Sequence, residues 1–144
     1  AHSDHARGYS RLLFGTETTL EIYRMRWPAA PDKDQDLRPV QLGQSWEFRG
    51  ARLTALAAGH ILGAAQLLVE YRGERLLYTG DIKARVPLCG SPSEFAHAEH
   101  LIIESTFGLP VYHFLEREEA ATRILAFARE CLEDGATPVF TGYA

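Results

Sequence analysis

The sequence predicts a mixed α/β fold, and three observations support this prediction. Between residues 37 and 79, short apolar segments alternate with turn-forming residues, a pattern typical of β-strands. On either side, residues 16–27 and 115–133 carry apolar residues at helical spacing. The composition, 46% hydrophobic and 24% charged over 144 residues, is typical of a globular protein. No apolar run reaches the roughly 18 residues of a membrane span, so we expect no membrane contact.

The first expected elements are a strand and a helix. The apolar residues 12–14 predict a short buried strand. Thr16 is a suitable N-cap for the helix that follows, and Pro28 should stop that helix near Trp27. The predicted helix presents one apolar face to the core, made of Leu20, Tyr23 and Trp27. The polar, proline-rich residues 28–35 predict a surface loop.

The middle of the chain predicts a series of strands bounded by turn residues. The tripeptide Arg72-Gly73-Glu74 is the expected hairpin connection between two of them. The expected strands are residues 39–42, 45–48, 52–57, 66–71, 75–79 and 100–103.

The last expected elements are a helix and a strand. Residues 115–133 predict an amphipathic helix that Gly135 closes. Pro138-Val139-Phe140 predicts the start of another strand. The apolar stripe of the helix consists of Ile124, Phe127, Ala128, Cys131 and Leu132.

The charge and the cysteines limit the function classes. The net charge of −4 and the pI of about 5.9 argue against a generally basic nucleic-acid binder. They do not exclude a phosphodiesterase, because metal ions can supply positive charge at the phosphate. Cys89 and Cys131 are far apart in sequence, and unpaired thiols suit a reducing cytosol, which predicts a cytoplasmic protein. Cys89 has no neighbouring base, so we assign it no nucleophilic role.

Residues that divalent metals accept as ligands stand at three places in the chain. His2, Asp4 and His5 form a cluster, while His60 and Asp81 each follow a glycine at the end of an apolar run. Imidazole and carboxylate are ligands of zinc and manganese. Each place alone has an ordinary explanation, as a solvated loop histidine, a histidine in a turn or a turn-forming aspartate. Their order along the chain favours one shared metal site.

That order resembles the metallo-β-lactamase superfamily, whose signature is His-x-His-x-Asp-His. His2, Asp4 and His5 match the last three named positions, His60 matches the next ligand and Asp81 the bridging carboxylate. The resemblance implies an αββα sandwich, incomplete at both ends in this chain. It also implies two divalent metal ions, with zinc expected and manganese as the alternative.

Longer sequence blocks narrow the resemblance to the β-CASP branch. Glu104 would be the first β-CASP motif acid. The blocks are Ala58-Gly59-His60-Ile61-Leu62-Gly63-Ala64-Ala65-Gln66, Tyr78-Thr79-Gly80-Asp81-Ile82-Lys83 and Ile103-Glu104-Ser105-Thr106-Phe107-Gly108. The run Phe107-Gly108-Leu109-Pro110-Val111-Tyr112 is similar to the bacterial ligase-associated DNA exonucleases. The resemblance implies a partial metallo-β-lactamase-like domain at residues 1–108 and the start of a cap domain at residues 109–144.

The resemblance implies metal-assisted phosphodiester hydrolysis by a hydroxide that two metals activate. Asp4 would orient that hydroxide and bind the second metal. Glu104 would orient a ligand imidazole; its alternative role is to cap the next turn through Ser105 and Thr106. The implied activity is a DNA exonuclease in repair, with a DNA ligase or helicase as the expected partner.

Three alternatives stay open. The first is an RNA-processing nuclease of the same branch, similar to ribonuclease J or the pre-mRNA 3′-end endonuclease. The second is a small-molecule hydrolase such as a glyoxalase-type thioesterase, against which the Glu104-Ser105-Thr106 block argues. The third is a metal-free binding or structural module that keeps only the fold.

Other polar residues have weaker claims to function. His97 and His100 flank Glu99, and we expect them to be surface imidazoles. Tyr112 and His113 are candidates for substrate contact. Lys83 and Arg85 follow Asp81 and are either phosphate contacts or solvated charges.

The family pattern also requires ligands that this sequence does not contain. A first histidine would precede Ala1, and further histidines would follow Ala144. We therefore expect the chain to be a piece of a longer protein and to be poorly active alone. Stoichiometric tight binding of two zinc ions by this chain alone would contradict that expectation.

Overall fold

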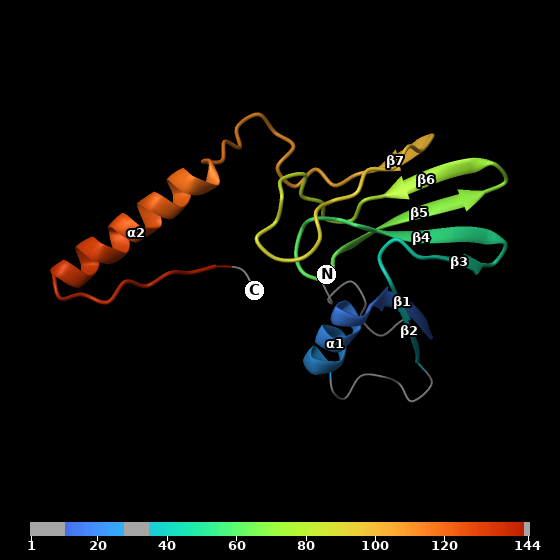
Figure 1. Ribbon diagram of the computed structural model, residues 1–144, viewed down its shortest axis with the longest axis horizontal. Coiled ribbons are helices and arrows are strands. Elements are labelled where there is room, and N and C mark those ends of the chain that lie inside the picture. The colour runs from blue at the N-terminus through green and yellow to red at the C-terminus, as the bar shows by residue number, and fades with distance from the viewer. Residues whose placement is uncertain (1–10, 28–34, 143–144) are drawn as a thin grey trace. The chain divides into compact units, whose positions relative to one another are not determined.

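The computed structural model describes residues 11–27 and 35–142, and the chain divides into two compact units, Ala1–Glu104 and Ser105–Ala144 (Figure 1). The described part of the first unit is mixed α/β, as predicted. Its elements are β1 (Leu12–Thr16), α1 (Glu17–Arg26), β2 (Asp36–Val40), β3 (Ser45–Phe48), β4 (Ala51–Ala57), β5 (Ala65–Tyr71), β6 (Glu74–Tyr78) and β7 (His100–Ile102). The second unit contains α2 (Arg117–Glu133). The assignment of residues 1–108 and 109–144 to two domains remains a prediction.

Helix α1 begins and ends where the sequence predicts. The side chain of Thr16 accepts a hydrogen bond of 3.3 Å from the Thr19 N–H, which satisfies one of the free donors of the first turn. The helix ends at Arg26, and the N–H of Trp27 donates to the Tyr23 carbonyl at 3.0 Å. Leu20 and Tyr23 are buried, as the helical spacing indicates.

Strand β2 differs from the prediction for a nonlocal reason. It pairs in parallel with β1, and Leu12 lies opposite Asp36 in this register. Pairing therefore starts at residue 36 rather than at residue 39. The strand contains Pro39, which lacks an N–H; this is tolerated because, among the described strands, β2 pairs with β1 alone.

The larger sheet has five strands in the order β3-β4-β5-β6-β7. The first four are antiparallel neighbours, and β7 runs parallel to β6. Strand β3 has the predicted bounds, and β4, β5 and β6 each begin one residue earlier than predicted. Arg72 and Gly73 have φ of 52° and 85°, the left-handed conformation of a tight hairpin turn, which confirms the predicted connection.

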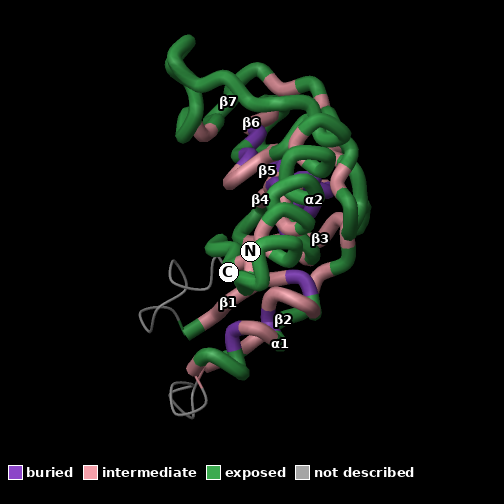
Figure 2. The backbone as a smooth tube through the Cα atoms, turned by 90° about the vertical axis from the view of Figure 1, so that its left-hand side faces the viewer, coloured by how far each residue is buried: buried purple, intermediate pink, exposed green. Residues whose placement is uncertain are grey.

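The buried residues of the first unit lie mainly on α1 and the central strands (Figure 2). They include Leu20, Tyr23, Leu53, Ala55, Ala57, Leu68 and Leu77. Burial alternates at the start of β5, where Gln66 and Leu68 are buried, because side chains point to opposite faces of a strand; in β4 the consecutive residues 53–55 are all buried. The Phe14 ring lies 5.4 Å from Trp46 and 5.5 Å from Phe48, so β1 packs against β3.

The second unit bears out the predicted helix but not the strand expected after it. Gly135, with φ of 71°, ends α2, and its N–H donates to the Leu132 carbonyl at 3.1 Å. Residues 138–140 form no strand, so that prediction is wrong. A strand needs a neighbour for its backbone N–H and C=O groups, and no described strand pairs with this segment. Instead, the Phe140 ring packs edge-on against Phe127 at 5.6 Å.

Candidate metal centre

The sheet topology brings three polar loops to one edge of the larger sheet. Strands β4 and β6 are both antiparallel to β5, so they run in the same direction, and β7 is parallel to β6. The carboxyl ends of these three strands therefore lie at the same edge. His60, Asp81 and Glu104 follow these ends by two to three residues.

His60 and Asp81 meet above the start of β5. Their parent strands are separated by β5 and are therefore about 10 Å apart. Nevertheless, Nε2 of His60 lies 4.0 Å from Oδ2 of Asp81, and the two side chains are 31% and 40% exposed. The separation is too long for a hydrogen bond. Two ligand atoms of a tetrahedral zinc ion with bonds of about 2.0–2.2 Å lie about 3.3–3.6 Å apart, so a small movement of either side chain would bring both ligand atoms within reach of one cation.

Backbone hydrogen bonds hold the two loops against each other. The N–H of Lys83, two residues after Asp81, donates to the carbonyl of Ala58 at 2.9 Å. Gly59 has φ of 67°, and a Cβ at this position would lie 2.8 Å from the Ser93 nitrogen. Only glycine combines this left-handed backbone with so close an approach, which explains the residue that precedes His60.

Glu104 supports the Asp81 loop. Its Oε1 accepts a hydrogen bond of 3.0 Å from the N–H of Ile82. A carboxylate bonded to the residue next to a candidate ligand restrains that ligand's backbone. The imidazole-orienting role assigned to Glu104 remains a prediction.

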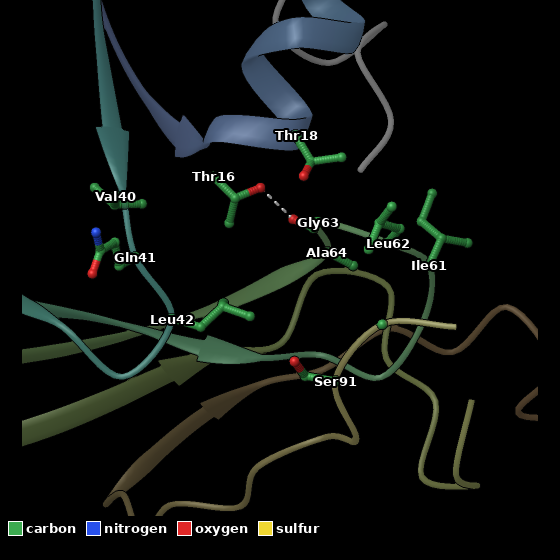
Figure 3. A pocket seen from close by; sticks show the side chains of 11 residues that line it. Thr16, Thr18, Val40, Gln41, Leu42, Ile61, Leu62, Gly63, Ala64 and Ser91 are labelled. Atoms are coloured by element: carbon green, nitrogen blue, oxygen red, sulfur yellow. Dashed lines mark hydrogen bonds between the residues drawn. The ribbon is translucent and has the colours of Figure 1, made fainter. Parts of the chain in front are cut away.

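The first turn of α1 is bonded to the loop that carries His60. The hydroxyl of Thr16 donates to the Gly63 carbonyl at 2.8 Å (Figure 3), and the hydroxyl of Thr19 donates to the same carbonyl at 3.0 Å. A pocket of about 300 Å³ adjoins this junction. Its polar lining comes from Thr16, Thr18, Gln41 and Ser91, and Ile61 and Leu62 supply apolar surface.

Three of the predicted ligands, His2, Asp4 and His5, lie outside the described residues. Within residues 11–27 and 35–142, no group of three or more histidine, cysteine, aspartate or glutamate side chains is arranged to hold a metal ion. The described part of the candidate centre thus consists of the His60–Asp81 pair and the adjacent Glu104. The metal-binding role of all five predicted ligands remains a prediction.

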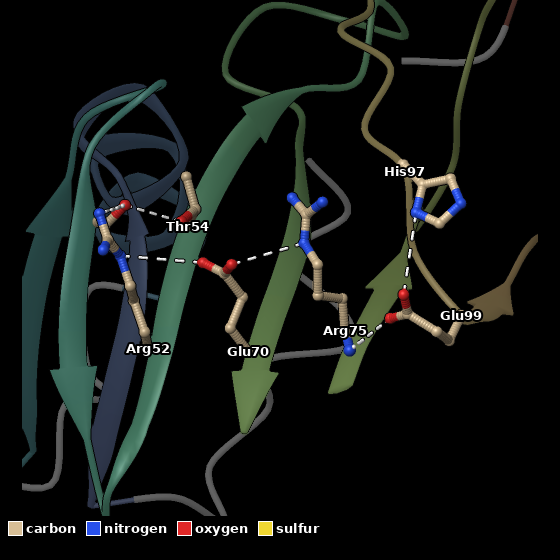
Figure 4. A network of polar contacts seen from close by, with 7 residues as sticks. Arg52, Thr54, Glu70, Arg75, His97 and Glu99 are labelled. Atoms are coloured by element: carbon tan, nitrogen blue, oxygen red, sulfur yellow. Dashed lines mark hydrogen bonds and ion pairs between the residues drawn. The ribbon is translucent and has the colours of Figure 1, made fainter. Parts of the chain in front are cut away.

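Two other histidine candidates lie at the surface: His97 belongs to the network of polar contacts that Figure 4 shows, and His100 pairs separately with Glu74. His97 Nδ1 lies 3.9 Å from a carboxylate oxygen of Glu99, and His100 Nε2 lies 3.1 Å from Glu74. The Arg75 N–H donates to Glu99 at 2.8 Å, and this bond, followed by the Glu99 backbone and the nearby charges of His97 and Arg75, lowers the pKa of Glu99. These are the surface imidazoles that the sequence predicts.

Tyr112 and Lys83, which were candidates for substrate contact, make contacts within the fold. The Tyr112 ring packs edge-on against Phe107 at 5.2 Å. Lys83 is exposed, and its backbone makes the loop contact described above. Cys89 and Cys131 are free thiols. Neither described helix is both long enough and apolar enough for a membrane span.

The structure reveals one polar residue to which the sequence analysis assigned no role. Gln66 is 1% exposed and lies on β5 between the two candidate ligand loops. The sequence does contain a signal for this residue. Successive side chains of a strand point to opposite faces, and Gln66 places a polar amide at a position of β5 that should face the core.

Comparisons with known proteins place the chain in a family. It is 36% identical over 147 residues to a protein named "Probable DNA ligase" from Opitutus terrae, covering 100% of this chain and 14% of that protein. It is 37% identical over 91 residues to cleavage and polyadenylation specificity factor subunit 3 of Dictyostelium discoideum, covering 61% of this chain and 12% of that protein. An RNase J-like protein of Methanocaldococcus jannaschii is 34% identical over 89 residues, with 60% and 21% covered.

A solved structure and the known family models were also compared with the chain. The structure of zinc-bound PqqB from Methylobacterium extorquens aligns with 53% of this chain and 27% of that chain, with a TM-score of 0.39 and 18% identity. That superposition is too loose to establish a common fold. No family model matches the chain.

The sequence relatives and the motif blocks indicate the same family. The sequence relatives and the strand-end histidine and aspartate place the chain in the metallo-β-lactamase superfamily, a class of metal-dependent hydrolases. Within this superfamily it belongs to the β-CASP branch. It spans 12–21% of the length of these three relatives.

Proposed function

We propose that the protein containing this sequence is a metal-dependent phosphodiester hydrolase, and that His60 and Asp81 are two of its metal ligands. The observation that supports this proposal is the 4.0 Å separation of their side-chain donors at the end of strands that are not neighbours. An imidazole nitrogen and a carboxylate oxygen are donors that zinc and manganese accept. When bound, two such cations supply an activated nucleophile at neutral pH and positive charge at the phosphate.

The chain's own residues prepare the site for these cations. His60 presents Nε2 from a loop that backbone hydrogen bonds fix on one side and the threonines of α1 on the other. Asp81 provides two oxygens, which allows it to bridge two cations. Glu104 holds the backbone beside Asp81 through Ile82. His2, Asp4 and His5 complete the proposed ligand set, and Asp4 also orients the nucleophile.

We further propose that the substrate is DNA and that the protein acts as an exonuclease in repair. The relative that covers this whole chain is named as a DNA ligase, and the run Phe107–Tyr112 resembles the ligase-associated exonucleases. These two features also favour a DNA ligase as the partner, and the free thiols of Cys89 and Cys131 favour a cytoplasmic location. Zinc is the proposed metal, because it accepts imidazole and carboxylate in open catalytic sites.

The second candidate is RNA cleavage. It is favoured by the relatives named as a cleavage and polyadenylation factor and as RNase J-like, which cover about three fifths of this chain. The same metal ligands would serve either substrate.

An assay of the complete protein on DNA and RNA strands of matched sequence tests both candidates. We expect shortening of the DNA strand, and we expect a chelator to abolish it and added zinc or manganese to restore it. Cleavage of RNA alone would transfer the assignment to RNA processing. Turnover of a thioester without nuclease activity would indicate a small-molecule hydrolase, and a complete protein that binds no metal would indicate a binding module.

A further inference from the structure

Gln66 occupies an unusual place between the two candidate ligand loops. It is the second residue of β5, it lies opposite Leu56 of β4, and it is 1% exposed. Strand β5 separates β4, which leads to His60, from β6, which leads to Asp81. A buried amide at this point requires polar partners, because burying an unpaired polar group is costly.

The amide of Gln66 finds those partners at the end of β4 and in the segment that returns to β4 after Asp81. Its Nε2 donates to the Ala57 carbonyl at 2.8 Å and to the Glu94 carbonyl at 2.6 Å. An NH₂ group has two hydrogens, so it can serve both carbonyls at once. The opposite orientation of the amide would direct Oε1 at two acceptors, and this fixes the assignment of nitrogen and oxygen.

The two accepting carbonyls lie at the end of β4 and in the segment that follows Asp81. Ala57 ends β4, three residues before His60. Glu94 lies in the segment that follows Asp81 and returns to β4, where its own N–H donates to the same Ala57 carbonyl at 2.9 Å. Gln66 therefore joins the start of the His60 loop to the return of the Asp81 loop by a link of one side chain.

The remaining atom of the amide takes no part in this link. Oε1 of Gln66 is buried, and no described residue donates a hydrogen bond to it. The link therefore depends on the NH₂ group alone.

We propose that Gln66 is a positioning residue that sets the separation of the His60 and Asp81 side chains and thereby the affinity of the site for its metal. The proposal rests on the proposed metal-binding function. Residues that hold ligand loops from outside change metal affinity by roughly 10- to 100-fold when they are lost. The two hydrogen bonds of Gln66 would act through the backbone at Ala57, three residues before His60, and at Glu94, where the segment after Asp81 returns to β4.

The test measures metal affinity and stability separately in the complete protein. Gln66→Met keeps the length of the side chain and removes both donors. The matched control is Thr54→Val, because Thr54 is also buried on the same sheet, and its hydroxyl bonds Ser45 at 2.8 Å, away from the two loops. Each apoprotein is titrated with Zn²⁺ by calorimetry and with Co²⁺ by its visible d–d spectrum, and thermal unfolding is recorded without metal.

We expect both variants to unfold at a lower temperature than the wild type. Gln66→Met should in addition bind Zn²⁺ at least about tenfold more weakly and show an altered Co²⁺ spectrum, whereas Thr54→Val should bind as the wild type does. Wild-type affinity and spectrum in Gln66→Met would overturn this proposal and leave the metal site intact. A wild-type protein that binds neither metal would instead overturn the proposed function.

A second variant covers the case in which Gln66→Met does not fold. Gln66→Asn keeps the NH₂ group on a side chain shorter by one methylene, so it can reach one of the two carbonyls. We expect Zn²⁺ affinity between that of the wild type and the loss described above. Unchanged affinity in folded Gln66→Asn, together with an unchanged Co²⁺ spectrum, would contradict the positioning role.

Discussion

Nε2 of His60 and Oδ2 of Asp81 lie 4.0 Å apart, although β5 separates the strands that carry them. Three small residues, Gly63, Ala64 and Ala65, connect the His60 loop to β5 at the crossing point. A Cβ on Gly80 would already touch the Ala65 carbonyl at 3.7 Å. The small residues at this crossing allow the two loops to approach each other over β5.

The first prediction concerns this pair. His60→Ala and Asp81→Asn each remove one atom that would bind the metal. We expect each to weaken Zn²⁺ binding by more than about 100-fold, because the loss of a residue that only supports the ligands already costs about 10- to 100-fold. Calorimetric titration of the complete protein measures this loss, and the nuclease assay should show a parallel decrease. His97→Ala is the control, since that side chain is 83% exposed in the separate surface network. Equal Zn²⁺ affinity of His60→Ala and His97→Ala would refute the ligand assignment.

The second prediction concerns the junction between α1 and the His60 loop. Thr16→Ala removes the helix N-cap and the hydrogen bond to the Gly63 carbonyl. We expect a loss of about 1–2 kcal/mol in the free energy of unfolding, measured by urea denaturation. Thr122→Ala, on the exposed side of α2, removes only a local bond to the Glu118 carbonyl and should cost less than about 0.5 kcal/mol. Similar losses in both variants would contradict the junction role.

The third prediction separates backbone strain from crowding at Gly59. Gly59→Ala places a Cβ on a left-handed backbone and 2.8 Å from the Ser93 nitrogen. Gly73→Ala meets the same strain, with φ of 85°, but nothing lies within 4 Å. Both should destabilise by about 1 kcal/mol or more, and thermal unfolding should show a clearly larger loss for Gly59→Ala. If the two losses are equal, the close approach of the two loops plays no part in stability.

The fourth prediction concerns the pH dependence of Glu99. Its pKa is lowered in the folded chain from an ordinary value of 4.5, chiefly by the N–H of Arg75. The ionised carboxylate therefore favours the folded state above pH 4.5, and this contribution is lost as the pH falls through the lowered value. We expect Glu99→Gln to be less stable than the wild type at pH 7, and the difference should shrink below pH 4.5 in urea unfolding. A difference that grows on acidification would contradict the sign of this shift.

Elements with local causes could be predicted from the sequence. The Thr16 cap and the Arg72–Gly73 turn each depend on residues within one turn, and both are where the sequence indicates. The start of β2 and the absence of a strand at residues 138–140 depend on which distant strand is available for pairing. Local patterns contain no information about that choice.

The candidate site likewise combines features that the sequence indicates with features that depend on distant residues. The order of the ligand-type residues indicated that His60 and Asp81 belong together, and the strand order explains how they meet. The role of Gln66 depends on hydrogen bonds to carbonyls 9 and 28 residues away. Since any residue type can offer a backbone carbonyl, no sequence motif marks these partners.

The most direct test of the account is a crystal structure of the complete protein with Zn²⁺, with anomalous diffraction recorded at the zinc edge. We predict an anomalous peak between His60 and Asp81, with Nε2 and a carboxylate oxygen each about 2.0–2.2 Å from the ion. A peak elsewhere in the molecule, with these two side chains free of metal at saturating Zn²⁺, would contradict the proposed centre.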